Sequence, residues 1–305
     1  MRILVTGANG FIGAHLCQEL SRRGINFRAT ARNSNANNYA DFVNCDLETA
    51  ESLDQLMDGC DIVVHLAGRA HVTSDDSKEK YRVANEFVTQ RLADAAIKNG
   101  ISRFVYLSSI KVNGESSGPG LPIRSTDVPS PLDNYGRSKL AAEQALQEIC
   151  SASSMDYVII RPTLVYGKGV KANFSALISA VKRGIPLPIA TVKNSRSMIG
   201  INNLIDLIVA TCTNPKAANQ TFLASDGIDT STPELVRLIA KSLNRRTRIF
   251  PFPISILRSL AAVFGKSTVI DKLTGSLAVD ISHTTNTLNW HPPFSIESEI
   301  AKAVK

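Results

Sequence analysis

Two residues in the middle of this chain have the types and spacing of a proton-transfer pair. Tyr135 and Lys139 are four residues apart, so a helix through Tyr135-Gly-Arg-Ser-Lys139 would place both side chains on one face. A phenol has an ordinary pKa of about 10 and is a poor acid or base at neutral pH. A neighbouring ammonium group stabilises the phenolate and lowers that pKa. The same spacing is equally typical of an exposed pair on a surface helix, so it leaves both interpretations open.

A pair of serines follows the apolar run that precedes this helix. Ser108 and Ser109 end a predicted strand, and ligands of parallel sheets lie beyond the carboxyl ends of their strands. A serine at that position either hydrogen-bonds a substrate oxygen or satisfies the turn.

The first strand runs into a glycine-rich turn. Thr6-Gly-Ala-Asn-Gly-Phe-Ile-Gly13 follows the apolar residues 3–5 and precedes a predicted helix over Phe11–Arg23. Glycines allow a tight turn and close approach of a pyrophosphate, and the helix N-terminus offers N–H groups and a positive dipole end. The spacing is G-x-x-G-x-x-G. It predicts a dinucleotide site near the amino terminus.

Strands and helices alternate through the first half of the chain, which predicts an α/β fold with a doubly wound parallel sheet of Rossmann type. The predicted strands are Arg2–Thr6, Asn26–Ala31, Phe42–Cys45, Asp61–Ala67, Arg103–Ser108 and Tyr157–Arg161, and the further helices are Leu53–Met57, Lys78–Asn99 and Asn134–Ser151.

After Arg161-Pro162 the pattern changes to short helices separated by prolines, such as Asn173–Arg183, Pro233–Leu243 and Pro253–Phe264. We therefore expect a cofactor domain over 1–165 and a smaller α/β substrate-binding cap over 166–305, with the chain crossing back once or twice. Such a cap would close over a ligand at the strand ends.

The composition is that of a globular protein, with 44% hydrophobic and 20% charged residues and a net charge of +7. Arg245-Arg246-Thr247-Arg248 is the densest basic cluster. We interpret it as a solvated loop and expect no nucleic-acid binding, because no basic stripe interleaved with aromatic residues accompanies it.

Cysteine usage and hydropathy indicate the compartment. Five widely separated cysteines without a C-x-x-C motif are typical of reduced thiols. The first strand begins at once, and no apolar run approaches the roughly 20 residues of a membrane span. We expect a cytoplasmic protein without stable membrane insertion, and no metal site.

Together these segments resemble the extended short-chain dehydrogenase/reductases, in their nucleotide-sugar epimerase/dehydratase branch. The resemblance covers about the first 170 residues. It rests on the segments Thr6–Gly13, Cys45-Asp-Leu47, His65-Leu-Ala-Gly68, Asn85, Val105-Tyr-Leu-Ser-Ser109, Tyr135-x-x-x-Lys139 and Arg161-Pro-x-x-Val-Tyr-Gly167.

The resemblance implies roles for these residues. Tyr135 transfers the proton, Lys139 holds the nicotinamide ribose and lowers the tyrosine pKa, and Ser109 orients the sugar oxygen. The implied cofactor-binding residues are Gly7, Gly10, Phe11, Ile12, Gly13, Arg32, Asp46, Leu47, Leu66, Ala67, Gly68, Asn85, Tyr135, Lys139 and Pro162.

Three further residues are candidates for holding the nucleotide sugar, beside Ser109 and Tyr135. Asn173 and Arg196 fall where the family binds the diphosphate, and arginine suits that role through its fork of donors. The alternatives are a helix N-cap for Asn173 and a surface charge for Arg196. Lys111 either reaches the substrate or is a solvated loop charge.

The residue after the second strand bears on the cofactor. Members that prefer NAD usually have an acidic residue there, whereas this chain has Arg32, which can accommodate a 2′-phosphate. We therefore expect NADP or NAD, with NADPH used at least as well as NADH.

The segment Ser108–Glu115, with 169–174 and 221–227, resembles a bacterial O-antigen subgroup of this branch. Our first prediction is NAD(P)H-dependent reduction of the C4 ketone of a UDP-4-keto-6-deoxy-N-acetylhexosamine, giving a product of the UDP-N-acetylquinovosamine type. The alternatives are a UDP-hexose or UDP-N-acetylhexosamine 4-epimerase with tightly bound NAD, and a non-catalytic dinucleotide-binding regulator. Dehydratases of this branch typically carry an acidic pair beside the catalytic serine or threonine. No such pair follows Ser109, so the resemblance argues against a dehydratase.

The long helices Lys78–Asn99 and Asn134–Ser151 resemble those that form a four-helix dimer interface in this family. We therefore expect a homodimer.

Overall fold

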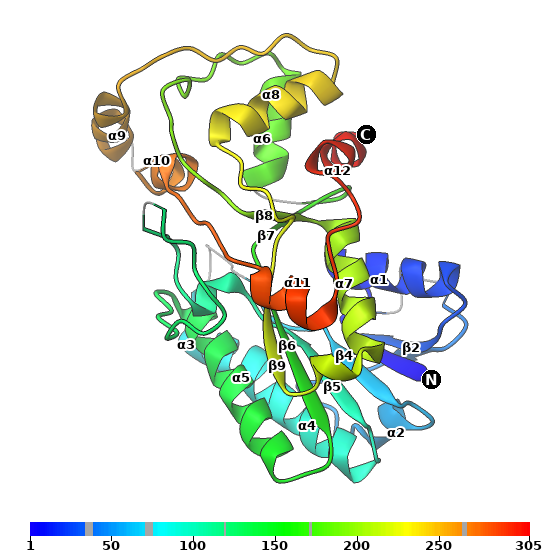
Figure 1. Cartoon of the computed structure of the whole chain (residues 1–305). Coiled ribbons are helices and arrows are strands. Elements are labelled where there is room, and N and C mark those ends of the chain that lie inside the picture. Colours follow the sequence, from blue (N-terminus) through cyan, green and yellow to red (C-terminus); the bar gives the residue numbers. More distant parts are fainter. Residues whose placement is uncertain (34–38, 71–75, 119, 171–172, 264–266) are drawn as a thin grey trace.

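A sheet of seven parallel strands forms the centre of the molecule, as the alternating pattern predicts (Figure 1). The computed structural model describes residues 1–33, 39–70, 76–118, 120–170, 173–263 and 267–305. The strand order is β3-β2-β1-β4-β5-β6-β9. The strands are β1 (Arg2–Thr6), β2 (Asn26–Ala31), β3 (Phe42–Asn44), β4 (Ile62–His65), β5 (Arg103–Leu107), β6 (Asp156–Pro162) and β9 (Gln220–Ala224).

Helices cover both faces of this sheet, so its central strands are apolar throughout rather than alternating. On one face α1 (Phe11–Arg22) and α7 (Ile201–Thr213) pack together over a cluster that includes Leu16 and Leu204. On the other face α2 (Asp54–Met57), α4 (Val88–Lys98) and α5 (Asn134–Ser151) pack over Phe104 and its apolar neighbours. The cofactor-binding part therefore has the predicted doubly wound architecture.

The helix predicted over Lys78–Asn99 is three connected pieces. A first turn, α3 (Lys78–Tyr81), leads into the π-helical stretch η1 (Arg82–Phe87), and α4 follows. Asn85 lies in that wider stretch with 1% exposure, and its carbonyl oxygen accepts a hydrogen bond from the Thr89 hydroxyl at 2.5 Å. Insertions of this kind are frequent at functional sites because they re-aim a side chain, and Asn85 is such a case below.

The second half of the chain contributes to both parts of the molecule. α7 and β9 return to the sheet, and β9 pairs with β6 in parallel register. The division at residue 165 remains a proposal. The other elements of this half are β7 (Leu164–Tyr166), β8 (Met198–Gly200), α6 (Asn173–Lys182), α8 (Thr232–Ser242), α9 (Ile254–Val263), α10 (Ser267–Thr274), α11 (Ser282–Leu288) and α12 (Ile296–Ala303), with the short 3-10 turns η2 (Ile110–Val112) and η3 (Pro215–Ala217).

The cap lies beyond one end of the sheet (Figure 1). The parallel pair β7-β8 leads into it, and its core joins α6 and α8 with α12 from the end of the chain. Within the described part of the chain, no helix is long and apolar enough to cross a membrane.

Candidate active site

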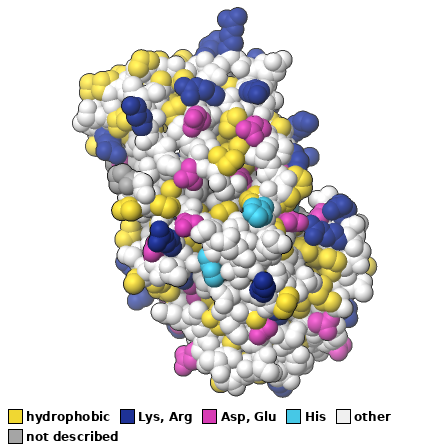
Figure 2. All heavy atoms as spheres, in the orientation of Figure 1, with side chains coloured by type: hydrophobic (Ala, Val, Ile, Leu, Met, Phe, Trp, Pro, Cys, Tyr) yellow, Lys and Arg dark blue, Asp and Glu magenta, His cyan; other side chains and the backbone are white. Residues whose placement is uncertain are grey.

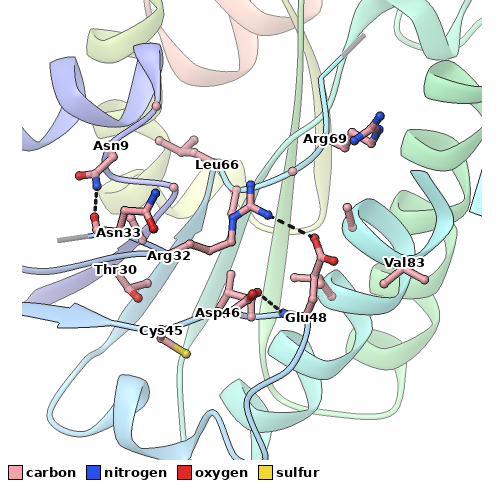
Figure 3. Close-up of a pocket in the computed structure, with 18 of the residues that line it drawn as sticks. Asn9, Thr30, Arg32, Asn33, Cys45, Asp46, Glu48, Leu66, Arg69 and Val83 are labelled. Atoms are coloured by element: carbon pink, nitrogen blue, oxygen red, sulfur yellow. Dashed lines mark hydrogen bonds and ion pairs between the residues drawn. The ribbon is translucent and has the colours of Figure 1, made fainter. Parts of the chain in front are cut away.

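The carboxyl ends of three neighbouring strands meet at the point where the strand order reverses. Thr6 of β1 is in register with His65 of β4, and His65 is in register with Tyr106 of β5. A cleft of about 650 Å³ opens beyond β1 and β4, which is where a doubly wound sheet binds ligands. Its lining includes eight of the predicted cofactor residues: Gly7, Gly10, Arg32, Asp46, Leu47, Leu66, Ala67 and Gly68 (Figure 3).

The three glycines of the first turn have different roles. Gly7 has φ +68°, and a Cβ there would lie 2.7 Å from the Ala67 nitrogen. A Cβ on Gly13 would lie 2.2 Å from the Gly7 carbonyl oxygen, so both glycines are needed for packing of the turn itself. A Cβ on Gly10 would meet only that oxygen, at 3.1 Å. Gly10 therefore keeps open the space before the α1 N-terminus, which fits a pyrophosphate.

Phe11 and Ile12 begin α1, and their side chains pack partly buried against the apolar cluster below the sheet. Their contribution to a dinucleotide site would come from the backbone N–H groups of the first helical turn. The residues of this region fit the dinucleotide that the sequence predicts.

An acidic residue that the sequence analysis did not assign lies opposite Arg32. The Arg32 guanidinium is 3.9 Å from the Glu48 carboxylate, and Glu48 also lines the cleft (Figure 3). The backbone N–H of Glu48 donates to Asp46 Oδ1 at 3.0 Å, which holds this turn in place. A carboxylate therefore lies near the position where Arg32 was predicted to meet a 2′-phosphate, which weakens the basis for the predicted NADPH preference. No local sequence pattern indicates this contact, because the turn after β3 sets the direction of the Glu48 side chain.

Asn85 joins the cofactor side of the cleft to the helix that carries Tyr135. Its Oδ1 accepts the Arg69 N–H at 2.8 Å, and its Nδ2 donates to Ser138 Oγ at 2.9 Å. A Cβ on Gly68 would lie 2.8 Å from Asn85 Oδ1 and 3.5 Å from Lys139 Nζ. Asn85 thus links the loop after β4 to α5, and Gly68 permits the close approach of the Asn85 side chain.

Lys139 is buried beside the end of β5. Its Nζ donates to the Leu107 carbonyl at 2.8 Å and lies 4.5 Å from the centre of the Tyr106 ring. Burial lowers the pKa of Lys139 to about 8, and the Glu143 carboxylate one turn later on α5 opposes that shift. The ammonium group is therefore held in place but weakly solvated, as expected of a group that acts on a neighbour's ionisation.

Tyr135 is partly buried at the start of α5. Burial raises the pKa of its phenol to about 12, and a hydrogen bond with the Ser109 side chain opposes this effect. Its ring centre is 6.1 Å from that of Tyr81. Ser109, Tyr135 and Lys139 come from β5's following turn and from one face of α5, as predicted, and their arrangement suits proton transfer to or from a bound hydroxyl.

A buried ion pair fixes α5 against the sheet. Arg161 Nε donates to Glu143 Oε1 at 3.0 Å, and Arg161 Nη1 donates to Asn113 Oδ1 at 3.0 Å. Arg161 and Glu143 are 6% and 1% exposed. The pair links the turn that carries Ser109 to the helix that carries Tyr135. Arg161 is one of the residues that carry the family resemblance, but neither it nor Glu143 was assigned a role.

His65 is fully buried beneath this site. Its Nδ1 is 2.7 Å from Thr6 Oγ1, and its ring stacks on Tyr106 with centres 5.7 Å apart. Burial lowers the pKa of His65 to about 3, and the positive charge of Lys139 acts in the same direction. His65 is therefore neutral at pH 7, and it packs against the Tyr106 ring that lies beside Lys139.

Two of the predicted sugar-binding residues, Lys111 and Arg196, bind other groups of the protein in the structure. Lys111 Nζ binds the Asp133 carboxylate and, at 2.8 Å, that of Glu115, so it joins the Ser109 turn to the N-cap of α5. Arg196 Nη1 donates to the carbonyls of Lys272 at 2.8 Å and Gly275 at 3.1 Å. The Asn173 side chain lies outside the described residues.

Pro162 ends β6, in register with Ala224 of β9. Its predicted place near a nicotinamide remains a prediction. Among the described residues no group of three or more His, Cys, Asp or Glu side chains could hold a metal ion.

Comparisons with known proteins show what the chain is similar to. The chain is 44% identical over 301 residues to a UDP-glucose 4-epimerase of Vibrio cholerae, covering 97% of this chain and 92% of that protein. It is 28% identical over 212 residues to a UDP-2-acetamido-2,6-beta-L-arabino-hexul-4-ose reductase of Pseudomonas aeruginosa, covering 67% of this chain and 48% of that one. The structure of MoeE5 in complex with UDP-glucose and NAD matches with a TM-score of 0.81 at 25% identity, covering 100% of this chain and 97% of that one.

The family model for the NAD dependent epimerase/dehydratase family matches residues 3–224, which include every strand of the central sheet but the first residue of β1. The cofactor of this family is NAD, and its predicted site is the cleft described above. The chain belongs to the NAD dependent epimerase/dehydratase family.

Proposed function

We propose that this protein is a 4-epimerase of a UDP-hexose or UDP-N-acetylhexosamine that keeps NAD bound through the reaction. The observation that carries the proposal is the convergence of Ser109, Tyr135 and Lys139 beside the cleft, in a chain 44% identical to a UDP-glucose 4-epimerase over nearly its whole length. The comparisons favour this activity over the C4 ketone reduction that was our first prediction.

The residues of the site support the following division of work. Tyr135 accepts the proton of the sugar's C4 hydroxyl and returns it after the 4-keto sugar has rotated in the site. Ser109 orients the C4 oxygen by a hydrogen bond. Lys139 stabilises the phenolate form of Tyr135 and lies beside Gly68 on the cofactor side. When bound, NAD supplies the acceptor and donor of the C4 hydride.

A role for Arg196 at the diphosphate belongs to the same proposal. Its Nη1 is bound to the carbonyls at the end of α10, which fixes the plane of the guanidinium. The N–H groups on its other nitrogens keep the fork geometry that suits a diphosphate. Asn173, at the first residue of α6, is proposed as a second diphosphate ligand.

Reduction of a UDP-4-keto-6-deoxy-N-acetylhexosamine is a second candidate. Two observations favour it: the similarity to the Pseudomonas aeruginosa reductase, and Asn113 where epimerases of this family often have tyrosine. Asn113 Oδ1 accepts a hydrogen bond from Arg161 Nη1, so the asparagine at this position is part of the buried network beneath the site.

One experiment separates the two activities. Purified protein without added cofactor is incubated with UDP-glucose and, separately, with UDP-N-acetylglucosamine, and the C4 epimers are measured. Interconversion with cofactor retained on the protein supports the epimerase. Absence of interconversion, together with stoichiometric NADH or NADPH consumption on the 4-keto-6-deoxy sugar, overturns it in favour of the reductase. Failure of both reactions would favour the non-catalytic regulator.

We also propose a homodimer through α4, α5 and η1. Phe87 of η1 is 42% exposed on the outer surface of this layer, and α4 packs against α5. Light scattering tests the proposal, and a dimer is expected at micromolar concentration. If Phe87→Glu converts the dimer to a monomer, the interface includes the surface around Phe87. A wild-type monomer contradicts it.

A further inference from the structure

Acidic residues are absent from two long segments of the sequence. Residues 157–205 and 235–270 contain 14 of the 34 lysines and arginines and none of the 27 aspartates and glutamates. The rest of the chain has 20 cations and all 27 acidic residues, so outside these segments acidic residues outnumber cations. The net charge of +7 is therefore concentrated in the part of the sequence that builds the cap, and the basic cluster at 245–248 belongs to a larger feature.

The fold brings the middle parts of these two segments together. The N–H of Leu187 donates to the Arg248 carbonyl at 2.9 Å, and that of Phe250 donates to the Leu187 carbonyl at 3.0 Å. Arg248 Nη1 also donates to the Gly184 carbonyl at 3.3 Å. The residues after α6 thus lie beside those after α8, and we call this surface the cationic tip. Its exposed cations are Lys182, Arg183, Lys241, Arg245, Arg246 and Arg248.

The cations of the tip differ from those around the sheet. Arg2, Arg28 and Lys98 each bind a carboxylate of the same layer. Within the described residues, none of the six tip cations forms an ion pair, and the pairs of the cap involve Arg258 and Lys302 instead. Unpaired cations gathered on one surface create a positive field that attracts an anionic partner.

Apolar side chains are exposed within the tip, at Ile185 and Phe250, and on α9, which follows it in the chain. Ile185 is 45% exposed, Phe250 is 41% exposed, and Ile256 at the start of α9 is 50% exposed. Phe250 also makes an edge contact with Phe252, with ring centres 6.4 Å apart. The surface therefore combines positive charge with apolar groups that have no protein layer over them.

The tip is also accessible to an extended surface. In Figure 1 the connection from α8 to α9 forms the end of the molecule farthest from α4 and α5, and Figure 2 shows Lys and Arg side chains projecting from this end. A flat partner could contact it without covering the helices of the proposed dimer.

We propose that the cationic tip docks on the surface of a membrane that contains anionic phospholipid. Lipid phosphates would complement the six cations, and Ile185, Phe250 and Ile256 would enter the boundary between headgroups and acyl chains. A nucleic acid would supply the phosphates but no apolar layer for these side chains. The contact is peripheral, and no helix of the described residues spans the bilayer.

The test is co-sedimentation of the full chain with vesicles of phosphatidylglycerol and phosphatidylcholine, compared with phosphatidylcholine alone. Binding is expected only with the anionic lipid and should weaken as salt increases. Each cation near an anionic surface strengthens binding by about fivefold. The variant Arg183→Glu/Arg245→Glu/Arg246→Glu should therefore bind at least about 100-fold more weakly. Ile185→Ser/Phe250→Ser should also weaken binding at unchanged charge.

The control variant reverses the charge of three exposed cations of the sheet layer, Arg22→Glu/Lys98→Glu/Lys216→Glu. It should bind the anionic vesicles as tightly as the wild type does. Turnover of a soluble UDP-sugar or, failing activity, an unchanged unfolding transition shows that each variant is folded. Lack of wild-type binding to anionic vesicles overturns the proposal, as does equal loss in the tip and control variants. Tighter binding of a duplex oligonucleotide than of vesicles, lost in the tip variant, would assign the tip to nucleic acid instead.

Discussion

The two ends of the active site are built in different ways. Around the cofactor cleft, the decisive contacts lie within one turn, such as Gly13 against Gly7, or between strand ends in register, such as Thr6 and His65. In the cap, Asn194 donates to the carbonyls of Leu273 and Gly275, and Arg196 donates to those of Lys272 and Gly275, across 76 to 81 residues of sequence. The contacts around the cleft thus join chain neighbours or strand ends in register, whereas these contacts of the cap join segments that are far apart in the sequence. The following predictions, in order of decreasing effect, test that difference.

The largest effect is expected at the chemical end of the site. Tyr135→Phe removes the proton-transferring oxygen and should lower kcat by about 10³ to 10⁴-fold, while NAD affinity and KM stay nearly unchanged. Steady-state kinetics and cofactor titration measure both. Tyr157→Phe, a partly exposed tyrosine at the start of β6, serves as the matched control. Turnover within tenfold of wild type would remove Tyr135 from its role.

The next effect concerns the buried pair that holds α5. Arg161→Met leaves the Glu143 carboxylate buried without its partner and should destabilise the fold by about 3–5 kcal/mol. Replacing both residues by Met should recover much of that loss, because no charge is then left unpaired. Denaturant unfolding gives the free energies.

The exposed cap pair Arg258–Asp271, whose Nε–Oδ1 distance is 3.4 Å, provides the comparison for that variant. Arg258→Met should change stability by less than about 1 kcal/mol. If Arg258→Met costs as much as Arg161→Met, burial of the Arg161–Glu143 pair is not the cause of the larger expected loss.

A third prediction concerns acid stability. His65 is neutral in the folded protein with a pKa of about 3, whereas in the unfolded chain it takes up a proton as the pH falls through its ordinary value. Its contribution to the unfolding free energy is therefore complete above about pH 6.5 and is lost as the pH falls toward 3. The loss at pH 4.5 is roughly 3 kcal/mol. His65→Asn should flatten the acid limb of the unfolding free energy. The exposed His291→Asn should leave that limb unchanged.

The smallest effect is expected at the sugar end. Arg196→Lys keeps the charge but loses the fork, and should raise KM for the UDP-sugar about tenfold with little change in kcat. Lys193→Arg, an exposed neighbour, is the control. A fall in unfolding free energy without a change in KM would assign Arg196 to holding α10 alone.

Particular residues show how far the sequence could be followed. The first-turn glycines, the strand-end serine and the Tyr135–Lys139 spacing could be predicted, because each depends on neighbours within a few residues or on the order of strands. Asp46 was predicted only from the family resemblance. Glu48 opposite Arg32 could not be predicted, since the turn after β3 decides which way its carboxylate points. The ion pairs of Lys111 with Asp133 and Glu115 were not predicted either. The pair with Asp133 forms only because the Ser109 turn lies against the α5 N-terminus.

The sequence by itself determined the alternation that builds a parallel sheet, the glycine-lined cleft and the placement of Tyr135 and Lys139 on one helical face. These follow from periodicity, steric limits and side-chain chemistry that act over short distances. Only the tertiary structure decided that α7 and β9 return to the sheet, that Glu143 and Arg161 form a buried pair, and that two acid-free segments meet at one cationic tip. Such contacts depend on the free energy of packing distant segments together, which no local spacing records.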